Sequence, residues 1–228
     1  MSALSRQTEM PPLLVADWQA DVTALLDEHH LSAWSDLPQR RTQFAVSLGQ
    51  FLGSQRDTEV CVFYGKFITD LESFCYQLER AVPGPSLDRA IEGDTGIVSL
   101  LRARASIKGR PETKYRFYIW HDADVLLRHN KALFGQIVDA MAGVAAEAEY
   151  VSDDLLLIHR SVLVGSSLLD IYSEDENAQF NSWLRDGSGE PYWQLVTGLA
   201  KPSFMRYKID ALSHAVVRER LRLTYGEA

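Results

Sequence analysis

The sequence predicts an α/β protein in which helices cover both faces of a mainly parallel sheet. Three short runs rich in β-branched and aromatic residues alternate with amphipathic helical patterns, and this alternation is typical of strand–helix–strand units. Such units pair their strands in parallel and join them by right-handed crossovers. We therefore expect three layers, with a helical layer at the amino-terminal end and a small α+β extension at the carboxyl-terminal end.

The composition is that of a folded soluble protein: 228 residues, 46% of them hydrophobic and 24% charged. We expect a disordered arm over residues 1–12 and a single domain over 13–228, with a core of about 59–167 and an extension of about 168–228. The chain shows no signal peptide and no apolar stretch of membrane-spanning length, and it has only two cysteines. These features favour a cytoplasmic location.

Two amphipathic helices are expected before the first strand. Apolar residues recur at three- and four-residue steps from Leu13, and a second such pattern follows Pro38. The two apolar stripes contain Leu14, Trp18, Val22, Leu25 and Leu26, and then Phe44, Ala45, Leu48, Phe51 and Leu52. His29 and His30 follow the first stripe, and as neighbours on a helix they would point about 100° apart.

The first strand is predicted over 59–64 and ends at Gly65. Thr69 and Glu72 have the spacing of a capping box, which predicts a helix that continues until Pro83. The apolar stripe of this helix contains Leu71, Phe74, Cys75, Leu78 and Val82. A loop over 83–96 and a short helix near 97–105 complete the connection.

The second strand, over 115–120, is the most strongly predicted, and a long helix follows Asn130. The third strand is expected over 155–164, with a bend at His159-Arg160. In the last sixty residues we expect helices near 179–185 and 192–200, a half-buried edge strand containing Met205, Tyr207 and Ile209, and a final basic helix. The pattern leaves open whether this segment joins the main sheet.

The formal charge of −8 excludes several classes of partner. Residues 201–222 contain six bases and two acids, a local charge of +4, so the remainder of the chain carries −12. Phosphate backbones and anionic lipids repel such a body, so we expect neither general nucleic-acid binding nor membrane binding. The basic tail would suit an acidic partner or the protein's own acidic surface, or it is the solvated face of the last helix.

Loops at the carboxyl ends of parallel strands converge on one crevice, and ligands bind there. Polar and acidic residues follow the predicted strands at this edge and in the loop over 83–96. Our first hypothesis is a non-catalytic interaction protein, without cofactor or metal, whose acidic face binds a basic protein partner. The candidate contacts are Asp88, Glu92, Asp94, His121, Asp122 and Asp124.

The alternative hypothesis is a degenerate nucleotide-binding or Mg²⁺-dependent phosphate-handling enzyme that uses the same crevice. Lys66 and Thr69 would contact phosphate, while Asp122 and Asp124 would hold the cation, with His129 or His159 as possible partners. The segment lacks the spacing of a phosphate-binding loop, because it has one glycine and Phe67 follows Lys66. A tight turn and helix-capping carboxylates explain the same residues.

The stretch from Val62 to Phe74, with its strand, glycine turn and helix, resembles the opening of barstar-like ribonuclease inhibitors. The stretch from Tyr118 to Leu126, the helix over 131–149 and the strand from Leu155 follow in the order of that family. The resemblance implies a small parallel α/β fold that inhibits a basic ribonuclease through acidic and aromatic groups near Asp88. This chain lacks the family's aromatic residue there.

Overall fold

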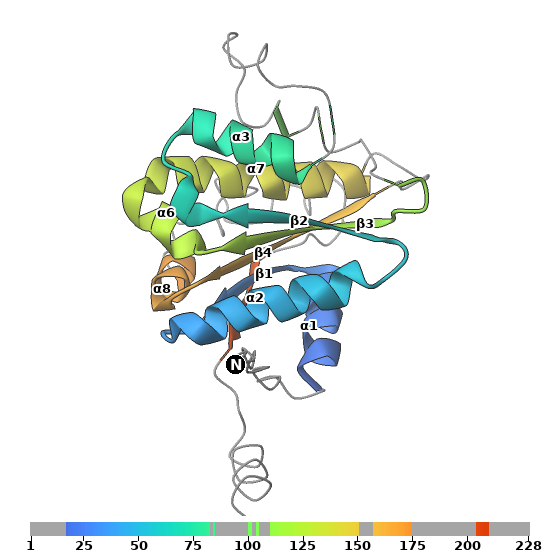
Figure 1. The fold of residues 1–228 in the computed structure, drawn as a ribbon, viewed down its shortest axis with the longest axis horizontal. Helices are drawn as coiled ribbons and strands as arrows, with labels where there is room; N and C mark the ends of the chain where they lie inside the picture. Colours follow the sequence, from blue (N-terminus) through green and yellow to red (C-terminus); the bar gives the residue numbers. More distant parts are fainter. Residues whose placement is uncertain are drawn as a thin grey trace, which may run out of the picture.

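The computed structural model describes residues 17–82, 84, 100, 101, 104, 110–150, 157–174 and 204–209 (Figure 1). Its strands are β1 (His30–Trp34), β2 (Thr58–Tyr64), β3 (Tyr115–His121), β4 (Ile158–Gly165) and β5 (Phe204–Lys208). Its helices are α1 (Asp17–Glu28), α2 (Pro38–Gly53), the short 3₁₀ helix η1 (Gly65–Phe67), α3 (Leu71–Ala81), α6 (Ala123–His129), α7 (Lys131–Tyr150) and α8 (Ser167–Glu174).

The five strands form one sheet in the order β2-β3-β4-β1-β5, and every pair is parallel. The connection from β1 to β2 crosses the sheet in one direction, and the connections from β2 to β3 and from β3 to β4 run in the other. Right-handed crossovers in opposite directions place their helices on opposite faces. Accordingly α1 and α2 cover one face while α3 and α7 cover the other (Figure 1), which confirms the three-layer α/β fold.

Each face of the sheet has its own hydrophobic core. Along β3, Phe117 and Ile119 pack toward α1 and α2, whereas Tyr118 and Trp120 pack toward α3 and α7. A strand buried on both faces has a continuous hydrophobic run rather than an alternating one, which is why this segment is so clear in the sequence. On the α3 side the rings of Phe63 and Trp120 stack with centroids 4.3 Å apart.

Several predicted elements are confirmed. The predicted strands over 59–64 and 115–120 are β2 and β3; β2 pairs with β3 and β3 pairs with β4, so the three predicted strands lie in one sheet as expected. The apolar stripes of α1, α2 and α3 are largely buried in the cores. The capping box was predicted one residue too early: Asp70, not Thr69, is the N-cap, its carboxylate accepts from the Ser73 amide at 2.8 Å, and the Ser73 hydroxyl accepts from the Asp70 amide at 3.1 Å.

The assignment of His29-His30 to the end of a helix is wrong, because His30 begins β1. This strand lies between β4 and β5, and its first four residues are buried. The segment His-Leu-Ser-Ala-Trp has no β-branched residue and contains two polar ones. Propensity therefore gives little indication of a strand, and pairing with neighbours on both sides decides it.

The third strand also differs from the prediction. β4 begins at Ile158 and runs as one continuous ladder, without the bend expected at His159-Arg160. Both side chains are buried because the fold supplies hydrogen-bond partners: Arg160 donates to the carbonyl oxygens of Leu26 and Asp27 at 2.8 and 2.7 Å. The helix α6, between β3 and α7, was not predicted.

The carboxyl-terminal segment does join the main sheet, since β5 pairs with β1 at the edge. Met205 of this strand is exposed, while Tyr207 is half-buried and Ile209 is buried. The predictions for the amino-terminal arm, the loop over 83–96 and the other carboxyl-terminal helices fall outside the described residues, as does most of the predicted helix near 97–105. Among the helices of the described part of the chain, none has the length and apolarity to cross a membrane.

Gly65 allows η1 to pack against the turn after β3, since a Cβ at this position would overlap the backbone carbonyl of Asp122. We expect Gly65→Ala to lower the free energy of unfolding by about 2 kcal/mol or more, measured by urea denaturation. Gly49→Ala is the matched control: its Cβ would lie 3.6 Å from Ile119 Cδ1, and alanine in a helix interior is favoured by about 1 kcal/mol. Equal effects of the two substitutions would contradict this packing.

Candidate functional site

The carboxyl ends of the five parallel strands lie at one rim of the sheet. A ligand crevice forms in such sheets where neighbouring strands lead into helices on opposite faces. Here β1 leads into α2 on one face, and β4 leads into α8, whose Leu169 and Tyr172 pack in the core of the other face. The switch point of this fold is therefore the junction between the ends of β1 and β4.

The protein's own groups fill this switch point. The Ser35 amide donates to the Gly165 carbonyl at 3.0 Å, which joins the two loops directly. At the first residue of α8, the Ser167 amide donates to Asp36 Oδ1 at 3.2 Å. Hydrogen bonds from the Ser167 side chain and backbone hold the pKa of Asp36 below its ordinary value. The Asp36 carboxylate thus lies where a helix amino terminus would otherwise bind an anion.

Asp124 lies buried beside the same junction and is 2% exposed. Its Oδ2 accepts from the Ser166 hydroxyl at 2.7 Å and lies 3.9 Å from an Arg128 nitrogen. Gly165 packs tightly on this carboxylate, because a Cβ on Gly165 would be 2.8 Å from Oδ1. Asp124 therefore joins the ends of β3 and β4 from within the fold. Among the described residues no three His, Cys, Asp or Glu side chains form a group suited to a metal ion.

The ends of β2 and β3 carry a second cluster, which is on the surface. We call Tyr64, Lys66, Phe67, His121 and Asp122 the exit surface. Lys66 Nζ lies 3.7 Å from Asp122 Oδ2 and 5.1 Å from the centroid of the Phe67 ring. The rings of Tyr64 and His121 stack at 5.0 Å, and burial lowers the pKa of His121. Asp122 adopts a left-handed conformation with φ of 52°.

The predicted site residues separate into three groups. His121, Asp122 and Lys66 come together on the exit surface, whereas Asp124 lies in the interior and Asp88, Glu92 and Asp94 fall outside the described residues. Thr69 is not part of the exit surface with Lys66; its hydroxyl donates to the Asp70 carboxylate at 3.2 Å. His159 is near the amino end of β4 and His129 is exposed on α6, so neither completes a metal site with Asp122 and Asp124.

A groove of about 760 Å³ runs between the outer edge of β2 and α3. We call it the β2–α3 groove. Large aromatic side chains stand exposed along it: Phe67 is 63% exposed, Tyr76 60% and Tyr64 40%. The side-chain amide of Gln77 pairs with both backbone groups of Tyr64, at 2.8 and 3.0 Å, and so covers part of the open strand edge. The groove is lined by Val62, Tyr64, Phe67, Asp70, Glu72, Ser73, Tyr76, Gln77, Arg80 and Ala81.

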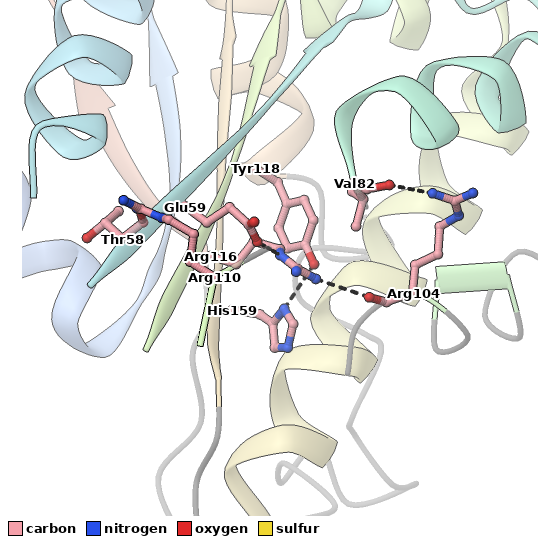
Figure 2. Close-up of polar contacts among 8 residues, drawn as sticks. All are labelled: Thr58, Glu59, Val82, Arg104, Arg110, Arg116, Tyr118 and His159. Atoms are coloured by element: carbon pink, nitrogen blue, oxygen red, sulfur yellow. Dashed lines mark hydrogen bonds and ion pairs between the residues drawn. The ribbon is translucent and has the colours of Figure 1, made fainter. Parts of the chain in front are cut away.

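At the opposite, amino-terminal end of the strands a buried polar network connects β2, β3 and β4 (Figure 2). Arg116 is fully buried; its Nε donates to Glu59 at 2.6 Å and its terminal nitrogen to the Arg104 carbonyl at 3.1 Å. The Tyr118 hydroxyl and His159 Nδ1 are hydrogen-bonded at 2.9 Å. Because these side chains come from three neighbouring strands, the network stabilises their register.

Two further arginines of this region bond to the backbone. Arg110 donates to the Thr58 carbonyl at 2.6 Å, and Arg104 donates to the carbonyl of Val82 after α3 (Figure 2). Burial lowers the pKa of His159 to about 3 and raises that of Tyr118. Both side chains are therefore neutral at physiological pH. The network is largely buried and its groups bond to one another and to the backbone, so we assign it a structural role.

The cysteines are packing groups, as expected. Cys61 and Cys75 are buried, and burial raises the pKa of the Cys61 thiol to about 12 and also raises that of Cys75. A thiol in such surroundings is a poor nucleophile.

The β2–α3 groove and most of the residues at the switch point were not predicted from the sequence. Asp36 was not considered, because the strand before it was not predicted. Phe67 and Tyr76 did carry a signal: each is an aromatic residue outside the apolar stripe of its helix, where a polar residue is the usual choice. Trp34, on β1, is another aromatic residue whose ring contacts a charged side chain: Lys208 Nζ from the neighbouring β5 lies 4.9 Å from its ring centroid.

No family model matches the sequence, and no curated protein matches it. Among solved structures, the chain is similar to part of one titled Drosophila ORC bound to GC-rich DNA and Cdc6, with 15% identity, a TM-score of 0.45 and coverage of 90% of this chain and 30% of that one. It is also similar to part of Drosophila ORC bound to poly(dA/dT) DNA and Cdc6, with 16% identity, a TM-score of 0.42 and coverage of 90% and 29%. The chain thus spans less than a third of either neighbour.

His159 and His30 are both held neutral by burial, which lowers their pKa values well below 6.5. Below about pH 6.5 the unfolded chain binds protons that the folded chain does not. The free energy of unfolding should therefore decrease as the pH is lowered below this value, by up to about 1.4 kcal/mol per pH unit for each histidine. We expect His159→Gln to remove about half of this slope in urea titrations between about pH 7 and pH 5.

His129→Gln serves as the control, because His129 is exposed, and it should keep the wild-type slope. If His159→Gln has the same slope as the wild type, His159 is protonated in the folded protein and the buried neutral pair with Tyr118 is refuted.

Proposed function

We propose that this protein is a non-catalytic interaction protein that binds a basic protein partner through the exit surface. The observation that carries the proposal is the contrast between the two halves of the rim. At the switch point, where a small ligand would bind, Asp36 and Asp124 are engaged with Ser167 and Ser166. At the exits of β2 and β3, exposed aromatic and charged side chains are presented to solvent.

The chemistry of the exit surface suits a protein partner. Among the residues that the structure describes, Phe67 and Ile171 are the most exposed large hydrophobic side chains, and Tyr64 adjoins Phe67 with ring centroids 6.1 Å apart. Exposed aromatic groups of this kind anchor protein interfaces, since they remove large apolar areas from water on binding. Asp70, the N-cap residue of α3, is exposed nearby and adds negative charge to that of Asp122. A basic partner would complement them and associate faster at low ionic strength.

The phosphate-handling alternative receives less support. Lys66, the proposed phosphate ligand, lies beside Asp122, and the carboxylate of Asp36 is at the amino terminus of α8. An incoming phosphate would meet negative charge at both places. Asp124 is buried against Gly165 and is not available to a hydrated cation or to a partner. We therefore omit Asp124 from the proposed contact surface.

The resemblance to barstar-like inhibitors favours the same class of function, in which an acidic surface binds a basic protein. Asp88, the residue that carries the inhibitory part of the resemblance, falls outside the described residues. An inhibitor-like action on a ribonuclease therefore stays a prediction within this proposal.

A photo-activated cross-linker tests the exit surface. With benzoylphenylalanine in place of Phe67, irradiation in cells should yield an adduct with another protein, identified by mass spectrometry, and the yield should fall as salt is raised in extracts. The control places the same group at Val46, which is exposed on α2 across the sheet. Equal adducts at both positions, no adduct at position 67, or a product made only of two copies of this chain would each contradict the proposal.

A thermal-shift panel compares the two functions. We expect ATP or GTP with Mg²⁺ to leave the melting temperature unchanged within about 1 °C, because a ligand that does not bind the folded state contributes no stabilisation. A rise of several degrees that disappears in Lys66→Ala would instead support phosphate binding and overturn our assignment.

A further inference from the structure

The outer face of α3 carries three exposed side chains in a row: Glu72, Tyr76 and Arg80. They are spaced four residues apart, so they lie one above the other on the same side of the helix. All three line the β2–α3 groove. The opposite side of α3, with Phe74, Cys75 and Leu78, is buried in the core, so this exposed row is not a consequence of packing within the chain.

The two charges of this row lack partners of opposite sign in the described part of the chain. Glu72 makes no ion pair there, and Arg80 contacts Tyr76, with a nitrogen 3.5 Å from the hydroxyl and the guanidinium 5.6 Å from the ring centroid. Along the helix axis Glu72 and Arg80 are about 12 Å apart, at 1.5 Å per residue. This separation is too large for them to neutralise each other.

The order of the row is self-complementary. An acid lies about 6 Å before Tyr76 along the axis and a base about 6 Å after it. If a second α3 lies antiparallel to the first and a two-fold axis passes beside Tyr76, then each Glu72 lies opposite the Arg80 of the other copy. The two Tyr76 rings meet at the axis, in the arrangement that a two-fold interface requires, with the same patch on both sides.

We propose that the exposed α3 row of Glu72, Tyr76 and Arg80 is the interface of a homodimer, in which the α3 helices of two copies pack antiparallel about Tyr76. The charge complementarity selects a second copy over a foreign helix, because a foreign partner would not need an acid and a base placed symmetrically about an aromatic residue. This proposal goes beyond the partner binding proposed for the exit surface.

Charge reversal in the full-length chain tests the pairing. Glu72→Arg places two arginines opposite each other at both ends of the interface, and Arg80→Glu places two glutamates there. Symmetry applies each change twice, so we expect each variant to raise the dimer dissociation constant by about tenfold or more. Sedimentation equilibrium across a range of protein concentrations gives this constant for the wild type and both variants.

Mixing the two variants gives the sharper result. The Glu72→Arg copy presents two bases and the Arg80→Glu copy presents two acids, so an equimolar mixture should form a heterodimer with affinity near that of the wild type. The double variant, with both reversals in one chain, should also dimerise again. Glu28→Arg is the matched control: it makes the same change of charge at an exposed position on α1, and its dissociation constant should equal that of the wild type.

Circular dichroism and melting temperature confirm that each exposed variant is folded. The proposal is overturned if the wild type is monomeric at every concentration, if both single reversals dimerise as well as the wild type, or if mixing them restores no association. Each of these outcomes leaves the partner adduct at position 67 unaffected, so failure of the dimer and failure of the exit-surface proposal are distinguishable.

Discussion

Burial of β1 between β4 and β5 is the constraint on which the rest of this structure depends. A strand with neighbours on both sides and helices on both faces must satisfy every backbone group within the sheet and place every side chain in a core. One polar group of β1 meets this requirement through the neighbouring strand: the Ser161 amide donates to His30 Nδ1 at 2.9 Å. The insertion also separates β1 from β2 by two strands. The connection through α2 must therefore cross the sheet, and this crossing creates the switch point and the two helical layers.

The rim combines a topology suited to ligand binding with loops whose polar groups bond to one another. Parallel strands bring five loops together, and in many proteins this edge holds a phosphate or a metal ion. Here two carboxylates, Asp36 at the surface and the buried Asp124, bond to the protein's own groups. Asp36 bonds to the start of α8 and Asp124 to Ser166, so the loops are tied to one another. The polar groups that remain on the surface are gathered at the ends of β2 and β3, next to exposed aromatic rings. The same topology thus yields a hydrogen-bonded junction at the switch point and, at the ends of β2 and β3, a surface with exposed aromatic side chains.

The sequence predicted those parts of the fold that have a strong local signal. β2 and β3 are continuous hydrophobic runs, and α2 and α3 have regular apolar stripes, so all four were found. The short β1 was not, because its buried His30 and Ser32 look solvent-exposed in isolation. β4 was predicted, but with a bend at His159-Arg160, because these two side chains also look solvent-exposed in isolation. His30, His159 and Arg160 are hydrogen-bonded in the interior to groups distant in sequence, as Arg160 is to the carbonyl oxygens of Leu26 and Asp27. The candidate site was predicted in part: Lys66, His121 and Asp122 do lie together at the ends of β2 and β3, whereas Asp124 is buried.

The sequence by itself determined the class of the protein, because hydrophobic periodicity and the alternation of strand and helix patterns are properties of neighbouring residues. It also determined the acidic character of the chain, which composition alone fixes. Only the tertiary structure decided which acids are exposed, which strand is central, and that the Glu72, Tyr76 and Arg80 row stands open beside a strand edge. Each of these depends on contacts between segments far apart in the chain, whose free energies are not encoded in the propensity of any single residue.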